Sequence, residues 1–256
     1  MEKINWYGMF YLTLREVKRF LKVYNQTIFT PMISALLFLT IFVLATGGSR
    51  EEISGIKFIN FIGYGLIIMS IMQQTFANSS SSFIMSKILG YVNDILMPPL
   101  GSIEIICAFT LGAVLRGVLV GIVVAISLIP FIDYNLMYPG LLALYVLLCC
   151  SFLGQLGLLT GLASNSFDQM SAFTSYIITP LSFLSGTFYS VKSLPMVFQY
   201  INMINPFFYV IDGFRYCLTG YADGNTQFGI IFLVFMNILL FQLLLKLISS
   251  GWKIKT

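Results

Sequence analysis

The feature that most constrains this chain is a series of seven long stretches with almost no charge. Six of them contain no Asp, Glu, Lys or Arg, and the other is interrupted only by Arg116. They cover residues 23–49, 58–86, 105–132, 134–167, 169–191, 193–211 and 224–245. Because about 20 consecutive apolar residues cross a bilayer as a helix, the pattern predicts an all-α polytopic membrane protein. We treat residues 1–256 as one transmembrane domain.

The composition excludes most other classes of protein. Of the 256 residues, 58% are apolar and 9% are charged, whereas soluble domains carry about 25% charged residues. A soluble fold of this size could not bury so much apolar surface, so soluble enzymes and nucleic-acid binders are excluded. The chain has no histidine, which removes His-based catalysis and His metal sites. The four cysteines lack a metal-binding spacing, so we expect no metal and no enzyme activity.

One of the seven stretches is more polar than the others. Residues 193–211 contain two prolines and three side-chain amides, which would leave polar groups unsatisfied in lipid. We therefore predict a re-entrant segment over 190–216, in which Asp212 and Arg215 are spaced to pair on a helix. Six spans remain, at about 28–47, 58–77, 104–127, 139–163, 171–189 and 227–246.

The basic residues are distributed unevenly about these six spans. Nine of the fourteen lie on the side of the two termini, in the amino-terminal segment, the loop after the second span and the carboxyl-terminal end. Four lie on the other side, and Arg116 lies within a span. By the positive-inside rule, both termini are expected in the cytoplasm.

Residues 5–25 have the pattern of an amphipathic helix. Apolar residues recur every three or four positions from Trp6 to Tyr24. Four cations fall on the opposing face: Arg15, Lys18, Arg19 and Lys22. A helix of this kind directly before a span is expected to lie in the lipid headgroup layer, with membrane lipids as its partner. The alternative is an ordinary packing helix.

Two further patterns concern the spans themselves. Small residues repeat every fourth position at Gly117 and Gly121 and at Gly157 and Gly161, which predicts closely packed helices. Arg116 lies about 18 Å along its span at 1.5 Å per residue. Its charge therefore needs a partner from another helix, a backbone carbonyl, water or an anionic group of a substrate.

The longest loop on the side of the termini contains a short predicted helix. Residues 86–97 carry apolar side chains along one side, and Pro98-Pro99 ends the segment. Such a helix suits a contact in the groove of a partner protein, and an ordinary connection is the alternative. The chain has no G-x-x-x-x-G-K-[ST] nucleotide motif, so transport would take its energy from a partner or an ion gradient.

Residues 176–220 carry the most specific pattern in the chain. It consists of Thr-Pro-Leu at 179–181, Gly186, Phe-Tyr at 188–189, Asn205-Pro206 and Gly-Phe-Arg-Tyr at 213–216. This pattern closely resembles the carboxyl-terminal signature of ABC-2-type permeases, the membrane subunits of one class of ABC exporters. Residues 94–99 are similar to the coupling segment of that family, and the resemblance extends from about residue 10 to 250.

The resemblance implies a permease in the bacterial inner membrane that exports a lipid, an oligosaccharide or polysaccharide, or an amphipathic drug. Separate subunits would bind the ATP, so the chain needs no cofactor, and two permease copies, as a homodimer, would complete the transporter. The residues expected to couple to the ATPase are Lys87, Asp94, Ile95, Leu96 and Pro98. Those expected along the pathway or its gate are Arg116, Gly186, Tyr189, Asn205, Pro206, Asp212 and Arg215.

Three other functions remain open at this point. An ion-coupled or facilitative transporter would work without an ATPase. A membrane enzyme would need a nucleophile or paired carboxylates within the spans, and a scaffold would need neither chemistry nor transport. Association with an ATPase would distinguish an ATP-driven exporter from all three.

Overall fold

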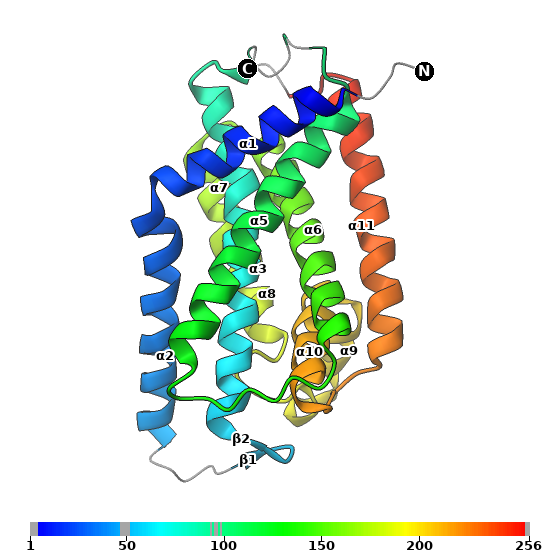
Figure 1. Cartoon of the computed structure of the whole chain (residues 1–256). Coiled ribbons are helices and arrows are strands. Elements are labelled where there is room, and N and C mark those ends of the chain that lie inside the picture. The colour runs from blue at the N-terminus through cyan, green and yellow to red at the C-terminus, as the bar shows by residue number, and fades with distance from the viewer. Residues whose placement is uncertain (1–4, 47–51, 93, 95–96, 98, 254–256) are drawn as a thin grey trace.

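The computed structural model describes residues 5–46, 52–92, 94, 97 and 99–253, which form a bundle of long helices (Figure 1). The elements in chain order are α1 (Trp6–Lys22), the π-helix η1 (Asn25–Phe29), α2 (Thr30–Thr46), β1 (Glu52–Ile53), β2 (Ile56–Lys57), α3 (Phe58–Ile88), α5 (Ser102–Leu128), α6 (Pro139–Ala163), α7 (Phe167–Phe173), the π-helix η2 (Thr174–Ile178), α8 (Thr179–Leu184), the 3-10 helix η3 (Val191–Ser193), α9 (Met196–Ile204), α10 (Pro206–Thr219) and α11 (Thr226–Ser249).

Five helical runs in the described residues are long and apolar enough to cross a membrane. They are Asn25–Ala45, Phe58–Ile88, Ser102–Leu128, Pro139–Ala163 and Thr226–Ser249. The predicted class, an all-α polytopic membrane protein, is in accord with this set. The span predicted at 171–189 falls on α7, η2 and α8, which form a continuous helical run. This run has Asp168 in its first turn and is not among the five. The count of six spans therefore stays a prediction.

Both π-helices have the same cause. η1 ends two residues before Pro31, and η2 ends two residues before Pro180. Proline has no N–H, and its ring clashes with the carbonyl four residues earlier, which lies inside the π-helix in each case. The wider π turn moves that carbonyl aside, so the helix continues through the proline instead of ending at it.

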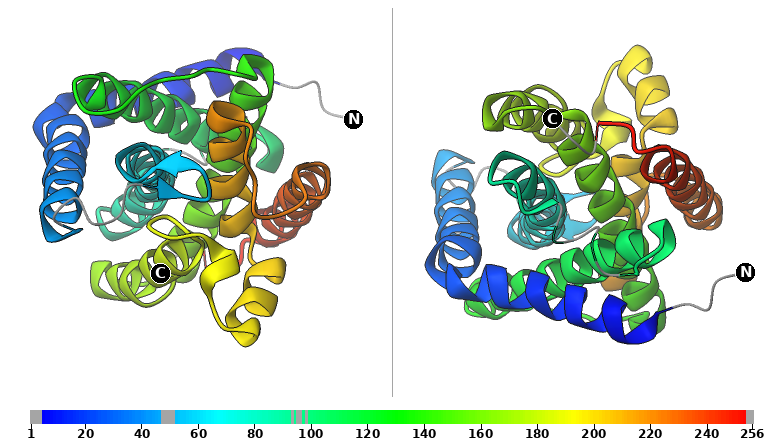
Figure 2. Two further views of the ribbon diagram at one scale, coloured as in Figure 1. Left: turned by 90° about the horizontal axis from the view of Figure 1, so that it is seen from below. Right: turned by 90° about the horizontal axis from the view of Figure 1, so that it is seen from above.

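α3 is the innermost of the long helices, with α2, α5 and α6 around it when the bundle is viewed from its ends (Figure 2). Glycines allow this close packing, as the spacing of the small residues predicts. A Cβ added at Gly117 of α5 would lie 2.0 Å from Oγ1 of Thr75, and one at Gly157 of α6 would lie 2.5 Å from the carbonyl oxygen of Phe76. The predicted tight helix packing is confirmed at both positions.

The two ends of the bundle differ in structure. α1 lies across one end, at which α11 also finishes, and we call this the α1 end (Figure 1). The β1–β2 hairpin, α9 and α10 lie at the other end, which we call the hairpin end. There, Lys57 Nζ lies 2.8 Å from Asp133 Oδ2 and joins the hairpin to the loop after α5. The hydrogen bond between them raises the pKa of Lys57 and lowers that of Asp133.

Candidate functional site

α1 presents three different faces. Leu12, Glu16 and Phe20, spaced by four, are buried against the bundle. Trp6, Phe10 and Leu21 belong to a second, exposed apolar face, while the cations form a third. The predicted apolar stripe is therefore exposed rather than packed against the bundle, as a helix in a lipid interface requires.

Glu16 is a carboxylate with no exposed surface. Its Oε1 lies 3.4 Å from Arg15 Nη2, and its Oε2 lies 3.4 Å from Arg19 Nε. The helix approaches α5 closely here, because a Cβ at Gly112 would lie 2.6 Å from the Cβ of Glu16. Removing a carboxylate from water costs several kcal/mol unless cations and hydrogen bonds compensate it, so the two arginines are what make this burial possible.

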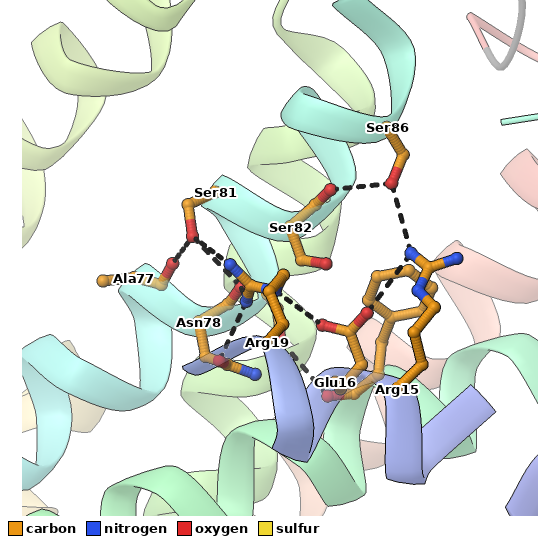
Figure 3. A network of polar contacts seen from close by, with 10 residues as sticks. Arg15, Glu16, Arg19, Ala77, Asn78, Ser81, Ser82 and Ser86 are labelled. Atoms are coloured by element: carbon orange, nitrogen blue, oxygen red, sulfur yellow. Dashed lines mark hydrogen bonds and ion pairs between the residues drawn. The ribbon is translucent and has the colours of Figure 1, made fainter. Parts of the chain in front are cut away.

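The same arginines bind α1 to α3 (Figure 3). Arg19 Nη2 donates to the backbone oxygen of Asn78 at 2.8 Å and to its Oδ1 at 2.9 Å. Arg15 Nη2 donates to Ser86 Oγ at 3.3 Å. We call Arg15, Glu16, Arg19, Asn78 and Ser86 the α1–α3 clamp. It gives a role to two of the polar residues in the carboxyl-terminal half of α3, Asn78 and Ser86.

The predicted coupling segment, 86–99, begins within the last turn of α3. The helix ends at Ile88, and Gly90, at φ 77°, turns the chain away. Asp94 is exposed. Ile95, Leu96 and Pro98 lie outside the described residues.

Lys87 has a clear role inside the chain. Its side chain is 5% exposed, and Nζ donates to the backbone oxygens of Leu162 at 2.9 Å and Ser164 at 2.7 Å. Lys87 therefore caps the carboxyl-terminal end of α6, where free carbonyls and the helix dipole favour a cation.

Arg116 is buried on α5 and finds its partner on α3. Its Nη2 donates to Oε1 of Gln74, whereas its Nε is buried and has no hydrogen-bond partner in the described ranges. Among the described residues, no carboxylate lies within ion-pair distance of this guanidinium. Of the partners that the sequence left open, the structure supplies a side chain from a neighbouring helix, and that side chain is neutral.

At the hairpin end, Asp212 and Arg215 are both buried but hold different segments. The Asp212 carboxylate accepts the backbone N–H groups of Asp223 at 2.8 Å and Gly224 at 2.9 Å. Arg215 Nη2 donates to the backbone oxygen of Gly186 at 2.7 Å, and its guanidinium lies 3.6 Å from the ring centroid of Phe61. Within the described part of the chain they form no ion pair with each other, because each side chain already has nearer partners in another loop.

The other residues predicted at the hairpin end also connect neighbouring segments there. Asn205 Oδ1 accepts the N–H of Phe207 at 3.0 Å and caps α10, while its Nδ2 donates to Ser185 Oγ at 2.8 Å. Pro206 occupies the first turn of α10, where its missing N–H costs nothing. Tyr189 donates to the backbone oxygen of Leu184 at 3.1 Å.

Asp223 lies at the centre of the hydrogen bonds at the hairpin end, and the sequence analysis did not single it out. Its carboxylate accepts from Ser190 Oγ at 2.8 Å, from the N–H of Val191 at 2.8 Å and from the hydroxyl of Tyr221 at 2.9 Å. With Gly186, Asp212 and Arg215 it forms what we call the hairpin-end cluster, which joins α8, η3 and α10. The turn motif Asp-Gly-Asn at 223–225 is the one signal that could have singled it out.

Glu16, Gln74 and Asn78 were also missed, since each is a polar residue whose partner lies on another helix. The described residues contain no group of three His, Cys, Asp or Glu side chains that could hold a metal ion. What the arrangement offers is mechanical: charged and polar groups join separate elements at each end of an apolar bundle.

Comparison with known proteins identifies the family. A family model described as ABC-2 type transporter matches residues 7–219, from α1 through the end of α10. The chain belongs to this family. Both the α1–α3 clamp and the hairpin-end cluster, except Asp223, lie within the matched range, and the resemblance read from the sequence is confirmed.

Named relatives agree with this assignment. The chain is 32% identical over 233 residues to the inner membrane transport permease YadH of Escherichia coli (strain K12), which covers 90% of this chain and 91% of that protein. It is also 32% identical over 71 residues to nodulation protein J of Rhizobium leguminosarum bv. viciae, covering 28% of this chain and 27% of that protein. As an ABC-2 member, the chain is a multi-pass membrane subunit of an ABC transporter, and the family implies an ATPase as its partner.

Proposed function

We propose that the chain is the permease subunit of an ATP-driven exporter in the bacterial inner membrane. It moves a lipid, an oligosaccharide or polysaccharide, or an amphipathic drug out of the cytoplasm. The observation that carries this proposal is the family match together with the α1–α3 clamp, which holds the helix that leads into the coupling segment. A motion imposed on that segment would reach α1 and α3 together.

The proposed topology has six spans with both termini in the cytoplasm. α1 and the end of α11 lie at the same end of the bundle (Figure 1), so the chain crosses it an even number of times. The helical run of α7, η2 and α8 supplies the fifth crossing. α9 and α10 then form the re-entrant element at the hairpin end, which faces outward and gates exit through the hairpin-end cluster.

The proposed contact with the ATPase lies after Gly90. Asp94 is exposed there, and Ile95, Leu96 and Pro98 follow it in the sequence. Lys87 contributes by fixing the end of α6 beside this segment rather than by touching the partner. Two permease copies, as a homodimer, and two ATPase subunits complete the transporter.

Arg116 is proposed to meet an anionic group of the substrate. Its buried guanidinium donates to the neutral Gln74, and within the described part of the chain its Nε has no hydrogen-bond partner. A charge at such depth costs about 2.5–3.5 kcal/mol on insertion scales, so a cation left without a counter-ion suggests that an anion visits it.

The experiment that tests this function is reconstitution of the permease with and without its ATPase in sealed vesicles. The proposal predicts that the two proteins purify as a complex and that ATP hydrolysis depends on the permease. It also predicts that an ionophore which collapses ion gradients leaves the activity unchanged. Transport by the permease alone that stops with the ionophore would instead establish the ion-coupled alternative.

A further inference from the structure

The exposed side of α1 contains a hollow that the proposed export function does not use. Its volume is about 600 Å³, and its walls are four cations with Tyr11, Leu14 and Val23. The cations are Arg15, Lys18, Arg19 and Lys22. No carboxylate is among these lining residues, so the hollow has a strongly positive wall beside apolar side chains.

The four cations do not contribute equally. Arg15 and Arg19 share the single negative charge of the buried Glu16 and also donate to α3, so both guanidinium groups are held in place and half of their combined charge is compensated. Lys18 and Lys22 are exposed, one turn apart, and make no hydrogen bond or ion pair within the described part of the chain. The clamp thus leaves two neighbouring ammonium groups free to bind an anion.

The position of the hollow indicates which anion can reach it. The exposed apolar face of α1 contains Trp6 and Phe10, with Tyr11 beside it at the edge of the hollow. An amphipathic helix with such a face lies at the boundary between acyl chains and headgroups. An anion at this depth is the phosphate of a lipid, and Leu14 and Val23 offer apolar contact to its chains.

We propose that this hollow is a binding site for the headgroup of an anionic phospholipid. Lys18 and Lys22 contact the phosphate oxygens, and Tyr11 lines the rim. Because Arg15 and Arg19 are fixed by the clamp, they hold α1 in place while the two lysines bind the lipid. With this site, the position of α1 at the membrane surface would depend on the lipid composition of the membrane.

The test is a titration of the detergent-solubilised full chain with a fluorescent short-chain phosphatidylglycerol. The variant Lys18→Gln/Lys22→Gln is compared with Lys246→Gln/Lys253→Gln, which removes the same charge from the same end of the bundle outside the hollow. The site predicts that the dissociation constant rises about fivefold for each lysine removed from α1 and hardly changes in the control pair. Equal losses in both variants would mean diffuse charge attraction and would overturn the proposal.

Two further arms keep the result interpretable on the wild-type chain. The dissociation constant should be much larger for the zwitterionic phosphatidylcholine analogue than for phosphatidylglycerol. For phosphatidylglycerol it should increase with salt, because salt screens the attraction between the lysines and the phosphate. Millimolar inorganic phosphate should not displace the bound lipid. Equal binding of both lipids, or full displacement by free phosphate, would contradict a headgroup site, and thermal unfolding at the wild-type temperature confirms that the α1 variant is folded.

Discussion

Glu16 and Arg19 form a pair in which only one partner is fully buried, and this asymmetry predicts unequal effects of mutation. In Arg19→Gln, the Glu16 carboxylate stays buried and loses a cation, which costs about 3 kcal/mol. In Glu16→Gln the buried charge is removed, and the exposed Arg15 and half-buried Arg19 can turn toward water, so the loss is about 1 kcal/mol. Thermal unfolding in detergent measures both variants.

The order of the two effects is the informative result. A larger loss in Glu16→Gln than in Arg19→Gln would mean that the carboxylate is not compensated as the clamp describes. Ser81→Ala serves as a control and should change stability little, since Ser81 accepts only a long 3.4 Å hydrogen bond from Arg19 and otherwise donates to backbone oxygens of its own helix, those of Ala77 and Asn78.

Arg116 gives a second prediction at the scale of a residue. Because its partner Gln74 is an amide, Arg116→Gln can keep a hydrogen bond to it and should fold normally. If Arg116 meets an anionic group, the Gln variant loses stimulation of ATP hydrolysis by substrate, while Arg116→Lys keeps part of it. Wild-type transport by Arg116→Gln would remove the residue from the pathway.

Sequence reasoning was most successful where a repeat along one helix decides a contact. The small residues repeated at Gly117 and Gly157 predicted close helix packing, and both positions show it. It failed where the partner is distant in the chain: nothing at Asp212 announces the N–H groups of Asp223 and Gly224. The i,i+3 spacing suggested Arg215 as the partner of Asp212 instead, because spacing along one helix carries no information about a loop that packs against that helix.

Among the elements, the contact between α3 and α6 depends on glycine. A Cβ at Gly157 would lie 2.5 Å from a backbone oxygen of α3, and backbone cannot move aside as a side chain can. Gly157→Ala should therefore destabilise the bundle by about 1–3 kcal/mol. Gly140→Ala is the matched control on α6, since a Cβ there meets nothing within 4 Å. Equal unfolding temperatures of the two variants would contradict this packing.

Long charge-free stretches predicted the long helices well but not their irregularities. The apolar stretches located α2, α3, α5, α6 and α11, because a membrane helix needs little more than length and apolar side chains. The helical run of α7, η2 and α8 is harder to classify, since Asp168 and Pro180 lower its apolar character. The buried face of α1 was missed because Glu16, judged by its sequence alone, is one more solvated charge.

At the scale of the whole molecule, the account predicts which end faces which side of the membrane. Lys18 lies at the α1 end and Lys192 at the hairpin end, and both are exposed. Each is replaced in turn by cysteine, as Lys18→Cys and Lys192→Cys. An impermeant maleimide should label position 192 only from outside and position 18 only from inside. Cys149, Cys150 and Cys217 are buried, so a Cys107→Ser background suffices. Labelling of both positions from one side would exclude the six-span topology.

The central claim is that an ATPase drives this bundle through the segment after α3. The measurement that tests it most directly is ATP hydrolysis and transport by the reconstituted complex carrying Ile95→Asp and Leu96→Asp, with Asn135→Asp at the hairpin end as the control. The account predicts that the double variant inserts normally but loses both association with the ATPase and transport, while the control keeps them. Wild-type association and transport by the double variant would contradict it.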